Sequence, residues 1–93
     1  MDVKEAARAA KKYLVDLLSE EEITNVGIEE VEFEDAAHDW KITIGFSRPW
    51  DHRNALLTAL DDQRSARTYK VICISDKNGQ VKSVKDRVLP ASA

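Results

Sequence analysis

The sequence has few of the residues on which several kinds of site depend. Cys73 is the only cysteine, so no internal disulfide can form, and the apolar run 71–74 favours a small core residue over a reactive thiol. The three glycines are not clustered, which excludes a phosphate-binding glycine loop. No apolar run reaches the roughly eighteen residues of a membrane span, and the charged N-terminus lacks the apolar core of a signal peptide. We therefore expect a cytoplasmic protein without membrane contact.

Motifs for catalysis and metal binding are also missing. The sequence contains no nucleophile elbow and no paired-cysteine metal site. His38 and His52 each precede or follow an aspartate, but neighbouring side chains on an extended chain point to opposite sides. Solvated surface histidines are the better interpretation. Asp61 and Asp62 resemble an acid–base pair, yet a solvated connection after a short helix explains them better. We expect no enzymatic activity, metal or cofactor.

What the sequence does contain indicates one small globular domain. Ninety-three residues suffice for a single two-layer core, and 43% hydrophobic with 33% charged residues is typical of a soluble domain. We expect an α+β fold in which an N-terminal helix packs on a four-stranded antiparallel β-meander, with a short helical insert between strands two and three. The expected boundaries are 1–20 for the helix, 25–47 for the first hairpin, 48–67 for the insert and 68–89 for the second hairpin.

The first segment predicts an amphipathic helix with Asp2 as its N-cap. Its charged side chains lie on one side of the helix. Its expected apolar face recurs at three- and four-residue spacing and comprises Val3, Ala7, Ala10, Tyr13, Leu14, Leu17 and Leu18.

The strand pattern begins at Val26 and changes parity before Val31, so we predict a β-bulge at Glu29-Glu30. A loop over 35–39 leads into a strand over 40–47, whose Trp40, Ile42, Ile44 and Phe46 share the parity expected to face the helix.

The segment 68–75 is apolar on both parities, which predicts a central strand covered over most of both faces. Asn78-Gly79 supplies a tight hairpin turn, because this pair readily adopts positive φ. The last strand is expected over 81–89, where Pro90 stops it.

The second half follows a recognisable order. A strand led by Trp40 is followed by Arg48, a strand led by Tyr69, the turn residue Gly79 and Arg87. This order resembles small helix-plus-β-meander domains of the PepSY type and is similar to gas vesicle protein O. The resemblance implies a non-enzymatic accessory or interaction module. The insert is longer here, and a tail rich in tyrosine and arginine is missing.

The charge is divided along the chain. Residues 1–47 hold five Lys/Arg and twelve Asp/Glu, whereas residues 48–93 hold nine Lys/Arg and five Asp/Glu. In a meander, strands one and four are the edges. The opposite charges either protect these edges or let strand four of one molecule pair with strand one of another; we favour protection. The residues concerned are Glu30, Glu32, Glu34, Lys82, Lys85 and Arg87.

The insert supplies the second candidate site. Its apolar stripe includes Trp50, and a helix of this length is too short to be stable alone. The stripe either covers the sheet face opposite the first helix, which we favour, or anchors a partner. The candidate partner-binding residues are Arg48, Trp50, His52, Arg53, Leu56 and Leu60.

The sequence therefore predicts a small non-enzymatic interaction or accessory module that docks through the insert or a sheet edge onto a protein partner or another copy. The alternative is a small-molecule-binding domain with an apolar pocket lined by Trp40, Phe46, Trp50 and Tyr69. Nucleic-acid binding by the basic half is not favoured, because the acidic half opposes phosphate.

Overall fold

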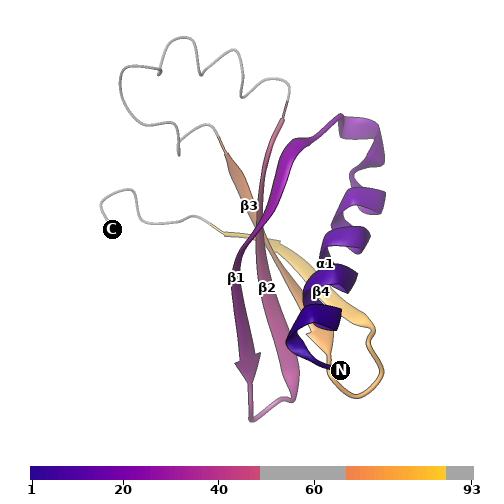
Figure 1. Cartoon of the computed structure of the whole chain (residues 1–93), viewed down its shortest axis with the longest axis vertical. Coiled ribbons are helices and arrows are strands. Elements are labelled where there is room, and N and C mark those ends of the chain that lie inside the picture. Colours follow the sequence, from indigo (N-terminus) through magenta and orange to yellow (C-terminus); the bar gives the residue numbers. More distant parts are fainter. Residues whose placement is uncertain (49–66, 88–93) are drawn as a thin grey trace, which may run out of the picture.

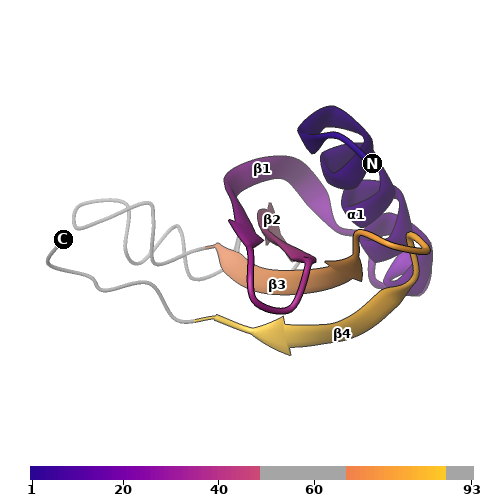
Figure 2. The same cartoon turned by 90° about the horizontal axis from the view of Figure 1, so that it is seen from below.

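The computed structural model describes residues 1–48 and 67–87 and gives them an α+β fold, as predicted. The sheet is antiparallel in the order β1-β2-β3-β4, with α1 on one side of it (Figures 1 and 2). The predicted helical insert and the last residues of the predicted strand 81–89 lie outside the described residues. The elements are α1 (Val3–Leu17), the 3₁₀ helix η1 (Ser19–Glu21), β1 (Thr24–Glu34), β2 (Asp39–Ser47), β3 (Thr68–Ser75) and β4 (Val81–Asp86).

Helix α1 begins where the sequence predicts. The Asp2 carboxylate accepts a hydrogen bond from the amide of Glu5 at 2.8 Å and so caps the first turn. The chain leaves η1 through Glu22, whose φ of 49° ends the helical run. No helix in residues 1–48 and 67–87 combines the length and apolar character needed to cross a bilayer.

The predicted apolar face of α1 is partly wrong. The buried residues are Ala6, Ala10 and Leu14, a single line at four-residue spacing, and Ala6 was not among the predicted ones. Tyr13 and Leu17 are 42% and 55% exposed. The alanines let the helix lie close to the sheet, so only a narrow line of helix residues contacts the strands. Larger side chains on either side of this line, and at the ends of the helix, remain exposed to solvent.

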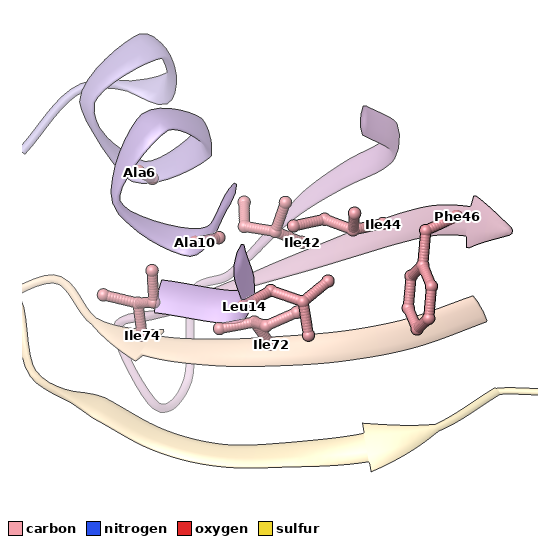
Figure 3. Close-up of a cluster of buried hydrophobic side chains, with 8 residues drawn as sticks. All are labelled: Ala6, Ala10, Leu14, Ile42, Ile44, Phe46, Ile72 and Ile74. Atoms are coloured by element: carbon pink, nitrogen blue, oxygen red, sulfur yellow. The ribbon is translucent and has the colours of Figure 1, made fainter. Parts of the chain in front are cut away.

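The core lies between α1 and the two central strands. Ile42, Ile44 and Phe46 of β2 are fully buried with Ile72 and Ile74 of β3. Figure 3 shows the three helix side chains pointing toward these isoleucines, with Phe46 farther along β2. Trp40 is half-buried at the edge of this cluster, so the predicted parity of β2 is confirmed.

The predicted bulge in β1 is present. Ile28 pairs with Ile44 and Glu30 pairs with Thr43, which leaves Glu29 as the extra residue. A second irregularity lies between Thr24 and Gly27. In the second hairpin, Gly79 has a φ of 70°, and the Asn78 side chain accepts a hydrogen bond from the amide of Gln80 at 2.9 Å. The Asn-Gly turn is therefore confirmed.

Truncation of Leu14 tests which line of α1 packs on the sheet. We expect Leu14→Ala to lower the free energy of unfolding by about 2–5 kcal/mol, because it leaves a cavity in a fully buried site. Leu17→Ala, at the more exposed position, is the matched control and is expected to cost less than about 1 kcal/mol. Urea denaturation measures both, and equal losses would contradict the assignment of the buried stripe.

Candidate functional site

The face of the sheet opposite α1, called the open face below, carries most of the charged side chains of the strands. In the described part of the chain no helix or strand lies over it (Figure 2). It contains a hollow of about 410 Å³ lined by Glu30, Glu32, Lys41, Thr43, Val71, Cys73, Ser83, Lys85, Asp86 and Arg87. The floor is made of short side chains and the rim of long charged ones.

Arg87 spans the open face from beyond the end of β4 to β1. Its Nη1 donates to the Thr43 hydroxyl on β2 at 2.8 Å and to Glu30 Oε1 on β1 at 2.9 Å. Thr43 is buried, so this hydrogen bond satisfies a hydroxyl that solvent does not reach. The Glu30 carboxylate raises the pKa of Arg87. One side chain thus links β1 and β2 to the chain just after β4.

Arg67, just before β3, makes a second cross-sheet link near the same end of the open face. Its Nη2 donates to the carbonyl of Asn25 at 2.9 Å and to Glu29 Oε1 at 3.3 Å. The bulge explains how this pair and the Arg87 pair coexist. In a regular strand, Glu29 and Glu30 would point to opposite faces, but the extra residue turns both toward the open face, where each carboxylate pairs with one arginine.

Gly45 makes room for this arrangement. It pairs with Tyr69 on β3 and with Gly27 on β1. A Cβ at Gly45 would lie 2.9 Å from Tyr69 Cε1 and 2.9 Å from Arg67 Nη2, which is too close for either atom. The aromatic ring and the guanidinium therefore occupy the space above a glycine in the middle of β2, a common reason for glycine inside a strand.

The opposite end of the open face holds a buried carboxylate. Asp39 is 5% exposed and accepts a hydrogen bond from Lys82 Nζ at 2.8 Å. This hydrogen bond lowers the pKa of Asp39 and raises the pKa of Lys82. Burial, together with the nearby Asp39 carboxylate, raises the pKa of the Cys73 thiol, which keeps it protonated. Lys41 pairs with Glu34 at 3.0 Å.

Arg48 leaves β2 toward the insert and is held on the helix side of the sheet. Its Nε lies 3.5 Å from Glu21 Oε1 in η1, and its guanidinium lies 5.4 Å from the centre of the Phe46 ring. Lys70 and Asp86 form an ion pair near the same end of β3 and β4, which lowers the pKa of Asp86. Of the predicted partner-binding residues only Arg48 is described; Trp50, His52, Arg53, Leu56 and Leu60 lie outside the described residues.

The predicted edge charges lie on the open face and pair within the molecule for the most part. Glu30 pairs with Arg87, Glu34 with Lys41, and Lys82 with Asp39. Glu32 and Lys85 have no ion-pair partner among residues 1–48 and 67–87. Whether these charges protect the edges or bind another molecule stays a prediction.

The predicted apolar pocket is wrong in its stated composition. Phe46 and Trp40 belong to the core on the α1 side. Tyr69 is cross-strand partner to Gly45, and its ring lies over that glycine on the open face. The sheet itself separates these side chains, since residues of opposite parity point to opposite faces. They cannot line one cavity, and the hollow that the structure contains has a charged rim.

Sequence reasoning missed Glu29, Gly45, Arg67 and the buried Asp39 as parts of one surface. Gly45 carried a usable signal, because an isolated glycine inside an alternating strand marks a close approach by another group. The two arginines carried none, since their partners are many residues away in sequence: Asn25 and Glu29 for Arg67, Glu30 and Thr43 for Arg87.

In the described ranges, no three His, Cys, Asp or Glu side chains gather in a way that could hold a metal ion. The comparisons with known proteins give no relative: no family model, no curated protein and no solved structure matches this chain.

The two glycines of the open face give a matched test of the close approach. Gly45→Ala is expected to lower the free energy of unfolding by about 1–3 kcal/mol, because the added methyl group displaces Tyr69 and Arg67. At Gly27 a Cβ would meet its nearest neighbours at 3.9 Å, an ordinary contact, so Gly27→Ala is expected to be tolerated. Thermal and urea denaturation of both variants measure the difference; similar stabilities would contradict the close packing over Gly45.

Replacement of Lys82 tests the buried carboxylate. Lys82→Gln is expected to raise the pKa of Asp39, because the attraction of the ammonium is lost and a neutral amide donor compensates burial less than a charged one. A carboxyl group whose pKa is lowered in the folded state stabilises that state at any pH above its unfolded pKa of about 3.9. This stabilisation is lost as the pH falls through the folded pKa. The wild type should therefore exceed Lys82→Gln in stability near neutral pH, and the gap should close in acid.

Carboxyl-carbon NMR follows the titration of Asp39, and urea midpoints between pH 7 and pH 2 follow the stability. Lys77→Gln, in the exposed turn between β3 and β4, is the matched control. An Asp39 titration that is the same in Lys82→Gln and in the wild type would rule out the pair as the cause of the low pKa.

Proposed function

We propose that this protein is a small non-enzymatic interaction module whose framework presents the segment 48–67 to a protein partner. The observation that supports this most is the way both ends of the segment are held. Arg48 contacts Glu21 and Phe46, and Arg67 contacts Asn25 and Glu29. Rigidly held ends are typical of binding segments carried on a scaffold.

The length of the connection gives further support. Phe46 and Thr68 are direct cross-strand partners, so a turn of two to five residues would be enough to join β2 to β3. The chain instead places 47–67 between them, including the apolar Trp50, Leu56 and Leu60. Long connections inside compact domains are usually functional, and a tryptophan with two leucines is a composition suited to anchoring a partner.

The ionisable groups favour an interaction role over a catalytic one. Catalytic groups are usually shifted toward titration near neutral pH. Here the pKa of each shifted carboxylate is lowered and that of each shifted lysine or arginine is raised, so both kinds of group keep their ordinary charge. These shifts are typical of ion pairs that hold a framework together.

The sheet edges are less favoured docking surfaces than the segment. The pairing of β1 with β2 is interrupted twice, and that of β4 with β3 once, between Cys73 and Ile74. Bulged edges twist away from a regular ladder and oppose the addition of another strand. The PepSY-type and gas vesicle resemblance agrees with an accessory role.

The test compares the proteins that co-purify with wild type and with Trp50→Ala from cells of the source organism. We expect at least one stoichiometric partner that Trp50→Ala and a Leu56→Ser/Leu60→Ser variant fail to retain, while both variants keep the wild-type unfolding midpoint. Tyr13→Ala, which removes an exposed aromatic ring from α1, is the matched control. Identical partners for all variants, or unfolding of Trp50→Ala, would contradict the proposal.

A further inference from the structure

Two rim charges on opposite sides of the hollow form no ion pair with the described residues. Glu32 lies on β1, at one side of the hollow, and Lys85 lies on β4, at the other. The other rim charges are paired within the molecule: Arg87 reaches across to Glu30, Lys41 pairs with Glu34, and Asp86 pairs with Lys70. The floor between the two sides is formed by Thr43, Val71, Cys73 and Ser83. The open face therefore offers one acidic and one basic group for a contact, separated by the width of the two central strands.

Such a face complements itself under one particular symmetry. A two-fold axis that runs parallel to the strands, between two facing sheets, places β1 of one copy over β4 of the other and the reverse. Glu32 of each copy then lies over the side of the sheet that carries Lys85 of the other copy. An axis perpendicular to the strands would place like charges together. Since a two-fold contact is closed, its product is a dimer and not a filament.

The two charges without an ion-pair partner lie at positions that this two-fold axis would bring together. Glu32 and Lys85 are the two rim charges without an ion-pair partner among the described residues, and both line the hollow. Glu32 is level with Lys41 and Cys73 across the sheet, and Lys85 is level with Val71. The two levels differ by two residues, about 7 Å along a strand, which a lysine side chain can span.

We infer that the open face docks on the open face of a second copy of this chain, with Glu32 of each copy against Lys85 of the other. The site differs from the segment 48–67, and the inference does not depend on the partner proposed for that segment. Four strands about 4.8 Å apart give a face of roughly 400 Å² per copy, half of a standard interface. We therefore expect a weak dimer that forms only at high protein concentration.

Sedimentation equilibrium up to about 1 mM protein measures the association at low and at high salt. We expect Glu32→Lys and Lys85→Glu each to weaken the dimer about tenfold or more, because each replaces two attractive contacts by two repulsive ones. An equimolar mixture of the two variants should recover the affinity, and so should the double variant. Glu20→Lys and Lys12→Glu, exposed positions on η1 and α1, are the matched controls.

Cys73 distinguishes face-to-face docking from pairing of edges. With sheets about 10 Å apart, the two Cys73 Cα atoms lie about 11 Å from each other, near the axis, so a short bismaleimide should link them. Edge-to-edge pairing also responds to charge reversal, but it forms open chains and keeps the two thiols apart.

A monomer at every concentration, a dimer insensitive to both reversals, or a dimer in which Cys73 reacts with the reagent but forms no link between copies would each overturn the inference. Circular dichroism of each variant confirms that it is folded, and the wild-type crosslink needs no variant. A monomeric wild type would assign the open face to another occupant, such as the 48–67 segment, and would leave the co-purification test with Trp50→Ala unaffected.

Discussion

A single fifteen-residue helix covers one face of the sheet, and the arrangement of the described residues follows from that constraint. The apolar residues of β2 and β3 that face α1 are fully buried, whereas Val71 and Cys73 on the other side are half-buried. Long charged side chains partly cover that other side. The cross-sheet pairs of Arg67 and Arg87 hold some of these side chains in place across the strands.

The bulge in β1 links the hydrophobic core to the charged face. It lets Val31, opposite Ile42, pack against the core while Glu29 and Glu30 both face the other way. Without the extra residue, one of the two arginines would lose its carboxylate. Gly45 then provides the room in which Arg67 and Tyr69 lie across the strands. The extra residue Glu29 thus links the strand register of the core to the ion pairs of the open face.

This framework carries two surfaces that meet at Arg67. On one, Arg48 and Arg67 hold the ends of a connection much longer than the hairpin requires. On the other, Glu32 of β1 and Lys85 of β4 lie at opposite sides of a shallow hollow. The first is suited to an apolar anchor and the second to a weak, charge-dependent contact. A protein that binds its partner through one surface and a second copy through the other would link self-association to partner recruitment by avidity.

The sequence alone was sufficient for features with local causes. The Asp2 cap, the parity of β2, the Asn78-Gly79 turn and the bulge at Glu29 each depend on neighbours within a few residues, and each prediction was confirmed. The buried residues of α1 were predicted only in part. The sequence shows which helix residues are apolar, but it does not show how closely the alanines let the helix approach the sheet. Tertiary structure alone decided that Arg87 reaches Glu30, that Tyr69 lies over Gly45 and that Asp39 is buried against Lys82. Those contacts join residues far apart in sequence, and their partners depend on sheet register and on which face each strand presents to the helix.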